Sequence, residues 1–254
     1  METSGDPRTV RAVQTTLDII STLQEKDRAG VTELATDLDR SKGTIHSHLT
    51  TLSENEYVVK EDDKYRLSLR YLELGESVKS QIDGYDIVQE EAEDLANKTG
   101  ELAQFATSEH GQIVYICKSP GENAVQTASS VGKREYMHCN SLGKAILANM
   151  AESRVDEIID RHGLPAFTDQ TITSREELHS ELETVRERGY AFDEEELIEG
   201  IRCVGAPIVA NDEIFGAISI SGPSTRMEGE QFRKEFPQMV TRSANVIEIN
   251  TKFA

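Results

Sequence analysis

The stretch VTELATDLDRSKGTIHSHLTTLSENEYVVKEDDKYRL, residues 31–67, decides the fold of the amino-terminal part of the chain. Thr32 is the expected N-cap of a helix whose inward side chains recur at helical spacing: Leu34, Ala35 and Leu38. After a turn at residues 39–40, Ser41 is the expected N-cap of a second helix. Its inward residues are spaced four and three apart: Ile45, Leu49 and Leu52. Two short apolar runs on either side of residues 61–63 then predict a β-hairpin.

A further helix is predicted before this stretch, from five apolar residues at spacings of three and four: Val10, Val13, Leu17, Ile20 and Leu23. Three helices followed by a hairpin predict a winged helix-turn-helix domain over residues 8–69. In that fold the third helix enters the major groove of double-stranded DNA and the wing contacts the backbone. Short hydroxyl groups and a lysine at a helix N-terminus suit base edges and phosphates. The predicted DNA-binding residues are Ser41, Lys42, Gly43, Thr44, His46, Ser47 and Thr50 on the helix, and Lys64 and Arg66 on the wing.

The charge of the chain is strongly acidic and unevenly distributed. Its 254 residues suggest two domains, and 27 Lys and Arg against 46 Asp and Glu give a net charge of −19. Residues 1–70 contribute −3 (10 basic, 13 acidic) and residues 71–254 contribute −16 (17 basic, 33 acidic). Because the acid is scattered, we interpret it as adaptation to a high-salt cytoplasm in preference to a partner-binding acidic face. We expect a cytoplasmic protein without a signal peptide or membrane segment.

The remainder of the chain predicts a linker helix over residues 70–84 and a second domain over residues 85–254. That domain mixes strands and helices without regular βαβ repeats, which favours an α+β class; one of its strands is expected near residues 124–128. On the strand at residues 214–221, alternation places Ser219 and Ser221 on one face and isoleucines on the other. Cys203 alternates in the same way on the preceding strand. A small, polar strand face of this kind suits a ligand cavity.

Four segments of the sequence together resemble the IclR family of transcriptional regulators over about residues 9–250. VTELATDLDRSKGTIHSHLTTLSENEYV and YRLSLRYLELG resemble its N-terminal domain, and SLGKAILA and RGYAFDEEELIEGIRCVGAPIVANDEIFGAISISGPSTR resemble its C-terminal domain. The resemblance implies a winged helix-turn-helix joined by a linker helix to a GAF-like α/β effector-binding domain. Two residues depart from the family pattern: Ser47 stands where an arginine is usual, and Gly43 replaces a common serine. We therefore expect an operator that is read differently.

The resemblance also implies an effector pocket, formed by a loop before the SLGKAILA helix and by the strands described above. Carried over by motif, its residues are Gly132, Lys133, Met137, Asp193, Cys203, Ser219 and Ser221. Asp193 would accept a hydrogen bond from an effector hydroxyl, and backbone N–H groups of the Gly132 loop, with Lys133 or Arg134 near, would hold a carboxylate. The expected function is control of a catabolic gene set in response to an organic or sugar acid. Because one winged domain contacts few base pairs, we expect a homo-oligomer, a dimer or tetramer.

Two other classes of protein remain alternatives: an enzyme using Cys203 or Asp193, and a small-molecule sensor that does not bind DNA. No nucleophile–base pair, phosphate-binding loop or HExxH motif is visible, and the three cysteines have no paired spacing. We therefore expect no catalytic residue, metal or cofactor. Simpler interpretations exist for the pocket residues as well. Ser219 and Ser221 could face solvent, Cys203 could be a small buried hydrophobic residue, and the carboxylates of residues 193–196 would be mostly solvated.

Overall fold

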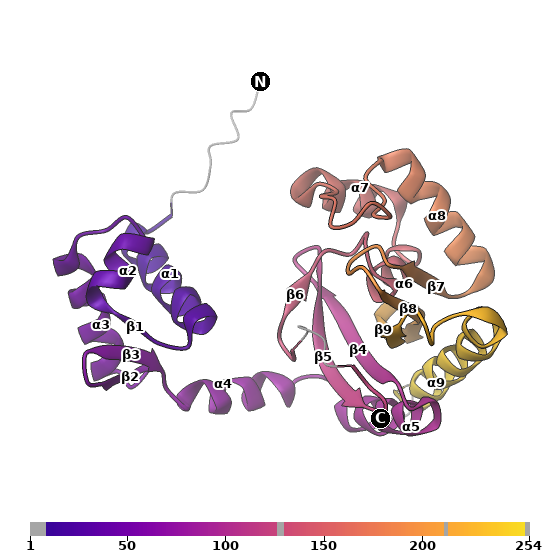
Figure 1. Ribbon diagram of the computed structural model, residues 1–254, viewed down its shortest axis with the longest axis horizontal. Coiled ribbons are helices and arrows are strands. Elements are labelled where there is room, and N and C mark those ends of the chain that lie inside the picture. Colours follow the sequence, from indigo (N-terminus) through magenta and orange to yellow (C-terminus); the bar gives the residue numbers. More distant parts are fainter. Residues whose placement is uncertain (1–8, 126–129, 211–212, 252–254) are drawn as a thin grey trace. The chain divides into compact units, whose positions relative to one another are not determined.

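The computed structural model describes residues 9–125, 130–210 and 213–251, and the chain divides into two compact units, Met1–Gln81 and Ile82–Ala254 (Figure 1). Among the described residues, the first unit has one hydrophobic core and the second unit has two. Within the described ranges, no helix is long and apolar enough to cross a membrane.

The first unit is a winged helix-turn-helix. Its elements are α1 (Arg11–Lys26), β1 (Ala29–Gly30), α2 (Val31–Asp37), α3 (Lys42–Glu54), β2 (Val58–Glu61), β3 (Lys64–Leu67) and α4 (Arg70–Lys79). The three strands form an antiparallel sheet in the order β1-β3-β2. Ile45, Leu49 and Leu52 of α3 are buried in the core, as their spacing predicts. The helices and the hairpin predicted from residues 31–67 are confirmed.

Two local predictions in this unit are wrong. The buried residues of α1 are Thr15, Ile19 and Leu23, whereas Val10, Val13 and Leu17 are more than half exposed. Burial of Thr15 is tolerated because its hydroxyl donates a hydrogen bond to the Arg11 carbonyl oxygen. The N-cap of α2 is Gly30, without a side-chain capping bond, and not Thr32.

The second unit is an antiparallel six-stranded sheet with helices on both faces. Its strands are β4 (Leu102–Glu109), β5 (Gln112–Pro120), β6 (Arg134–Glu135), β7 (Ala191–Glu194), β8 (Ile201–Ala210) and β9 (Glu213–Pro223), in the order β6-β5-β4-β9-β8-β7. Its helices are α5 (Tyr85–Thr99), α6 (Ser141–Leu147), α7 (Glu152–His162), α8 (Arg175–Arg188), a π-helical turn η1 (Gln231–Glu235) and α9 (Phe236–Thr251). The predicted α+β class is confirmed.

The two faces of this sheet have separate cores. Helices α5 and α9 cover one face, where Ile218 and Ile220 of β9 are buried (Figure 1). Helices α6, α7 and α8 cover the other face, where Ala217 is buried. The predicted alternation along β9 is therefore confirmed. In the region of the strand expected at residues 124–128, residues 124 and 125 have no regular structure and residues 126–129 lie outside the described residues.

Helix α6 is buried along its whole length. Its N-cap is Asn140, whose Oδ1 accepts the Gly143 N–H at 2.8 Å. A Cβ on Gly143 would lie 2.2 Å from the carbonyl oxygen of Met137. Glycine is required here because the backbone of the preceding loop approaches the helix that closely.

Candidate functional site

The outer face of α3 presents the residues that the sequence predicts for DNA contact. Ser41 Oγ accepts the Thr44 N–H at 3.0 Å, which confirms the predicted cap. All of the predicted helix residues are exposed: Ser41, Lys42, Gly43, Thr44, His46, Ser47 and Thr50. The Ser47 and Thr50 hydroxyls donate to carbonyl oxygens four residues earlier, at 3.0 and 2.9 Å. These bonds fix the two side chains and leave their oxygen lone pairs toward solvent.

His48, on the same helix, is half-buried because it lies toward α1. Its Nδ1 is 2.8 Å from Thr16 Oγ1. This contact joins α3 to α1, so His48 has a structural position, whereas the exposed His46 remains available for DNA contact.

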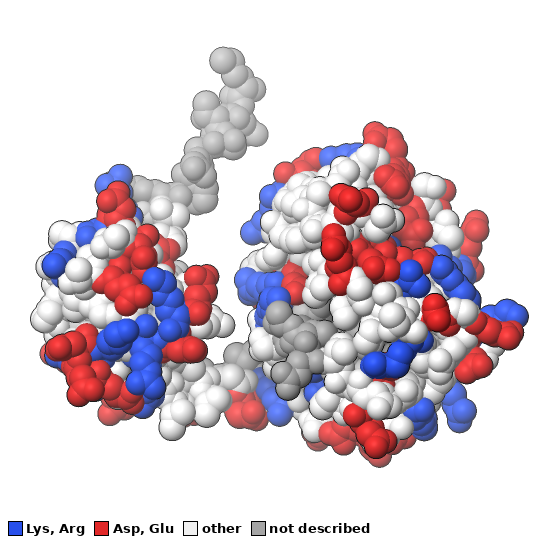
Figure 2. Space-filling view, viewed as in Figure 1, with Lys and Arg blue, Asp and Glu red and all other residues white. Residues whose placement is uncertain are grey.

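The wing holds its two predicted cations differently. Lys64 is exposed. It lies opposite Glu61 in the backbone register of the hairpin, without an ion pair between these two described side chains. Arg66 is half-buried and donates to Glu61 Oε1 at 2.7 Å and to the Leu67 carbonyl oxygen. Arg66 therefore braces the hairpin and has fewer free donors than Lys64. Figure 2 shows basic side chains gathered over part of the visible face of this unit, with acidic ones beside them.

A hollow of about 450 Å³ lies between α3, the start of α2 and the wing. The residues that line it include His46 of α3, Thr32 of α2, and Lys60 and Lys64 of the wing. Lys60 was not predicted as a DNA-contact residue. Lys60 lies two residues after the buried Val58 and opposite the buried Tyr65, so alternation along β2 would place it inward, yet its side chain is exposed and its Nζ lies 5.9 Å from the Tyr65 ring centroid. No local sequence pattern therefore identifies it.

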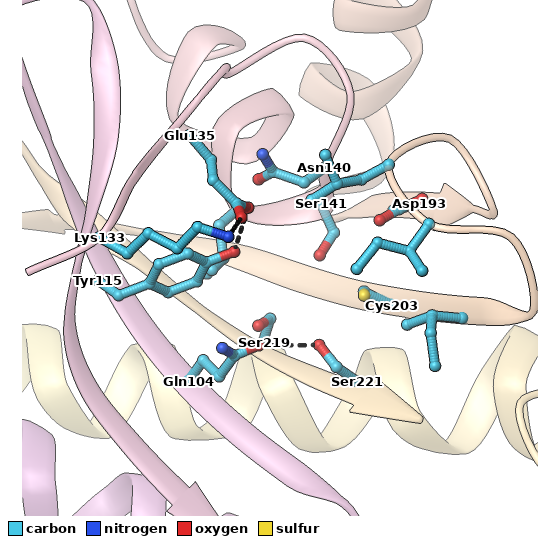
Figure 3. A pocket seen from close by; sticks show the side chains of 14 residues that line it. Gln104, Tyr115, Lys133, Glu135, Asn140, Ser141, Asp193, Cys203, Ser219 and Ser221 are labelled. Carbon is cyan, nitrogen blue, oxygen red and sulfur yellow. Dashed lines mark hydrogen bonds and ion pairs between the residues drawn. The ribbon is translucent and has the colours of Figure 1, made fainter. Parts of the chain in front are cut away.

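In the second unit, side chains from all six strands of the sheet converge on a pocket next to α6 (Figure 3). The enclosed volume is about 40 Å³. Five of the seven predicted effector residues line it: Lys133, Asp193, Cys203, Ser219 and Ser221. Sheet register explains the convergence, because Asp193 lies opposite Cys203, and Cys203 lies opposite Ser221. Directly opposed residues of antiparallel strands share a face.

The other two predicted residues lie outside this pocket. Met137 is buried in the core beneath α6, α7 and α8, and Gly132 donates its N–H to the Tyr115 carbonyl oxygen without lining the cavity. Prediction from sequence missed several lining residues, which are Gln104, Tyr115, Asn140, Ser141, Leu142, Leu197, Ile198 and Ile201. Gln104 pairs with Ser219 across β4 and β9, a non-local register that no local pattern contains.

One end of the pocket is formed by Asp193 and Cys203. Asp193 is 2% exposed, and its Oδ1 accepts the Glu196 N–H at 2.8 Å. Burial, followed by the nearby charge of Glu196, raises the pKa of Asp193 to about 7. Burial and the Asp193 carboxylate raise the pKa of the Cys203 thiol well above its ordinary value, so Cys203 is a neutral thiol and a poor nucleophile.

The opposite end is formed by Tyr115, Lys133 and Glu135. The Tyr115 hydroxyl donates to Glu135 Oε2 at 2.8 Å, and Lys133 Nζ lies 2.8 Å from Glu135 Oε1 (Figure 3). Lys118 lies opposite Gln104 in the sheet, and burial together with the charge of Lys133 lowers the pKa of Lys118. Two lysines therefore lie close together at this end.

Between the two ends, Gln104 Oε1 accepts a hydrogen bond from Ser221 Oγ at 3.2 Å. Ser219 Oγ is buried without a hydrogen-bond partner among the described residues. A buried hydroxyl without a partner costs free energy, and a bound ligand would satisfy it. Across the described ranges, no group of three or more His, Cys, Asp or Glu side chains is placed to hold a metal ion.

The expectation that the 193–196 carboxylates are mostly solvated is wrong for Glu196 as well as for Asp193. The Glu196 carboxylate is 8% exposed and pairs with the buried Lys144 ammonium of α6. The Thr171 hydroxyl donates to the Glu196 carbonyl oxygen at 2.6 Å. Glu196 is thus fixed behind Asp193, at the start of the loop that carries Leu197 and Ile198 into the pocket.

Comparison with known proteins agrees with this architecture. Residues 12–62 match the IclR helix-turn-helix domain, and residues 77–249 match the model described as "Bacterial transcriptional regulator IclR C-terminal". A probable HTH-type transcriptional regulator, ArcR, of Halobacterium salinarum is 33% identical over 99% of this chain and 97% of its own.

Two solved structures show the same fold. The Thermotoga maritima IclR crystal structure has a TM-score of 0.77 at 28% identity and covers 95% of this chain and 97% of that one. An IclR homolog from Microbacterium hydrocarbonoxydans, complexed with 4-hydroxybenzoate, has a TM-score of 0.79 at 19% identity and covers 94% and 100%. With a winged helix-turn-helix, a pocketed α+β unit and both family domains in sequence, this chain belongs to the IclR family of DNA-binding transcriptional regulators.

Proposed function

We propose that the exposed face of α3 reads an operator and that the pocket beside α6 binds a small organic effector that controls a catabolic gene set. DNA binding is assigned to residues 8–69, a linker helix to 70–84 and effector binding to 85–254. The observation that carries the effector assignment is the pocket with two chemically different ends around an unpartnered buried hydroxyl, Ser219 Oγ. The chain acts on DNA in the cytoplasm as a regulator and not as an enzyme.

The pocket chemistry favours a hydroxylated organic or sugar acid. Lys133, with Lys118 nearby, would attract a carboxylate, and Asp193 would exchange a hydrogen bond with a hydroxyl at the other end. The Microbacterium homolog was crystallised with 4-hydroxybenzoate, a hydroxy acid. The 40 Å³ enclosed here is far below the ~300 Å³ of a typical ligand pocket. Binding would therefore displace the 197–201 loop or the Lys133–Glu135 pair.

DNA contact is supported by the type and exposure of the α3 residues. Thr44, His46 and Ser47 can bond to base edges, while Lys42, Lys64 and Lys60 can neutralise phosphates. Arg66 contributes less directly because Glu61 holds it.

Homo-oligomerisation is supported by the need for two half-sites and by apolar side chains of α4. This helix has no buried residue, and Leu72, Leu74 and Val78 are all at least 42% exposed. We infer that a second copy of the chain covers them. Effector binding would then change the affinity for the operator by shifting the population of DNA-competent dimers.

A band-shift titration on the DNA upstream of the protein's own gene tests both parts. Simultaneous Lys42→Ala, Thr44→Ala and His46→Ala substitutions should abolish specific binding and leave the unfolding transition unchanged. Ser219→Val should leave operator affinity intact without effector and remove the response to hydroxy acids. Intact binding by the triple variant would contradict the DNA assignment, and an unchanged effector response in Ser219→Val would contradict the pocket assignment.

The large excess of acidic side chains supports the proposal that the protein is adapted to a high-salt cytoplasm. Carboxylates are spread over the visible face of the Ile82–Ala254 unit (Figure 2). If they hydrate the protein at high salt, the unfolding transition should move to lower temperature in dilute KCl. Operator binding should also persist at salt concentrations that dissociate ordinary repressors.

A further inference from the structure

A second hollow lies on the α9 side of the second unit and has a charge opposite to that of its surroundings. Its volume is about 520 Å³, within the range of small-molecule sites. It is lined by Arg188, Tyr190, Arg233, Lys234, Pro237, Gln238, Thr241, Arg242 and Asn245. All four charged side chains among these described residues are cationic, although residues 71–254 carry a net charge of −16.

The outer face of α9 shows the same departure from the acidic composition. Over its sixteen residues the helix contains one acidic side chain, Glu248, whose Oε1 accepts the Val209 N–H and which does not line the hollow. Gln238, Arg242 and Asn245 recur at spacings of four and three, which places them on one side of the helix, and all three are exposed. This face of α9 therefore differs in composition from the acidic remainder of the unit.

Two of the arginines are held rigidly. Arg188 donates to Glu181 and to the Tyr190 carbonyl oxygen, and Arg233 forms a two-pronged pair with Glu194 at 2.7 and 2.6 Å. Both guanidinium groups lie 5.0 Å from the Phe192 ring centroid. None of the three carboxylates that pair with Arg188, Arg233 and Lys234 lines the hollow. The pairs therefore position the cationic groups while leaving further N–H donors for a ligand.

Arg242 is the cation available for direct recognition. Among the described residues it has no ion pair and no hydrogen bond, and it is exposed beside the amides of Gln238 and Asn245. An unpaired arginine flanked by amide and hydroxyl donors suits an oxyanion with several oxygens. At high ionic strength the long-range attraction is screened within ~3 Å at 1 M salt, so only a ligand with multiple direct hydrogen bonds outcompetes chloride.

From these observations we propose that this hollow is a second ligand site, distinct from the effector pocket, and that it binds a phosphorylated small molecule. The phosphoryl oxygens bond to Arg242 and to the neighbouring amides, and the ring of Tyr190 borders the remainder of the ligand. The hollow and the effector pocket lie on opposite faces of β7: Phe192 packs in the α5–α9 core under the arginines, and Asp193 lines the pocket.

Isothermal titration calorimetry on the full chain tests the site, with inorganic phosphate and pyrophosphate as separate probes in constant 1 M KCl. Saturable binding of at least one probe is expected, and Arg242→Gln should weaken it tenfold or more. The matched control is Arg161→Gln on α7, which also removes an exposed arginine without an ion pair among the described residues. This control should bind as the wild type does.

Binding of pyrophosphate but not phosphate would identify a diphosphate-bearing ligand, and binding of both would identify a single phosphoryl group as sufficient. The proposal is overturned if neither probe binds saturably, or if Arg161→Gln weakens binding as much as Arg242→Gln. It is also overturned if Arg242→Gln abolishes self-association in sedimentation while neither anion binds, because the hollow would then be a contact between copies. Circular dichroism checks that both variants retain the fold.

Discussion

Replacement of Lys144 by methionine tests whether the buried ion pair behind the pocket holds the second unit together. The Lys144 side chain is 2% exposed and that of Glu196 is 8% exposed, so almost no water can solvate either charge. Glu181 Oε1 lies 3.6 Å from Lys144 Nζ, and Asp193 is also close enough for the lysine charge to lower its pKa. Lys144 is therefore the cation shared by three carboxylates. Methionine keeps most of the apolar stem of lysine but ends one atom earlier, so it removes the ammonium group with its charge and its hydrogen-bond donors.

The expected cost follows from the burial. Removing one partner of a buried pair leaves an uncompensated charge and typically destabilises a protein by about 3–5 kcal/mol. For a unit of this size, that corresponds to a fall in Tm of about 10 °C. Without the ammonium group, the pKa of Asp193 and of Glu196 would also rise further above the ordinary carboxyl range. Part of the lost stability should therefore return at acidic pH, as these groups become neutral.

Urea unfolding at constant KCl measures the effect, followed by far-ultraviolet circular dichroism because the chain has no tryptophan. The matched control is Lys98→Met, because Lys98 pairs with Asp94 at 3.2 Å on the surface, with both side chains more than half exposed. Loss of that exposed pair should change the free energy of unfolding little. The double variant Lys144→Met with Glu196→Gln should recover much of the loss. A single Lys144→Met variant within 1 kcal/mol of the wild type, or a double variant no better than the single, would refute the reasoning.

Three further predictions concern other parts of the chain. Burial raises the pKa of Asp193 to about 7, so between pH 4 and 7 the folded state holds a proton that the unfolded state has lost. The free energy of unfolding should therefore fall by up to about 1.4 kcal/mol per pH unit as the pH rises through this window. Asp193→Asn should flatten the dependence of the urea midpoint on pH in the same window. Gly143→Ala should destabilise the second unit by about 1–3 kcal/mol in the same assay, because the new Cβ meets the Met137 backbone. The control Gly75→Ala in α4, where nothing lies within 4 Å of the new Cβ, should be neutral or stabilising. Equal effects of the two variants would contradict the close approach of the Met137 backbone to α6. Lys64→Ala should reduce the slope of log affinity for the operator against log salt by about one, and an unchanged slope would remove Lys64 from the phosphate contacts.

The sequence is most informative where structure is local. Ser41 caps α3, and Ile45, Leu49 and Leu52 are buried, because capping and helical spacing depend on residues within a few positions of each other. Helical spacing did not predict the buried face of α1, because apolar residues occur on two sides of this helix. Periodicity cannot decide whether Leu17 or Ile19 faces the core, because the choice depends on what α2, α3 and the wing present to it.

The pocket was predictable only in part, for the same physical reason. Ser219 and Ser221 follow from alternation along one strand, and their shared face was predicted. Gln104 and Tyr115 depend on the order β5-β4-β9-β8 and on the register shift between Phe105 and Ala106, which no local pattern contains. Glu196 was expected in water because it belongs to an acidic run, and its partner Lys144 lies 52 residues away in sequence.

These buried contacts also separate two roles of the acidic residues. At the high ionic strength proposed for this protein, exposed pairs such as Lys98–Asp94 are screened and contribute little. Pairs with a buried carboxylate keep more of their interaction: Glu101, 4% exposed, forms a two-pronged pair with Arg226, whose side chain is 43% exposed, and the buried Lys144 holds Glu196. Most of the net charge of −19 therefore serves hydration of the surface, while a few buried carboxylates specify the architecture around the pocket. Because their effect depends on contact and not on long-range attraction, changing the salt concentration should alter solubility and surface stability before it alters the geometry of the effector site.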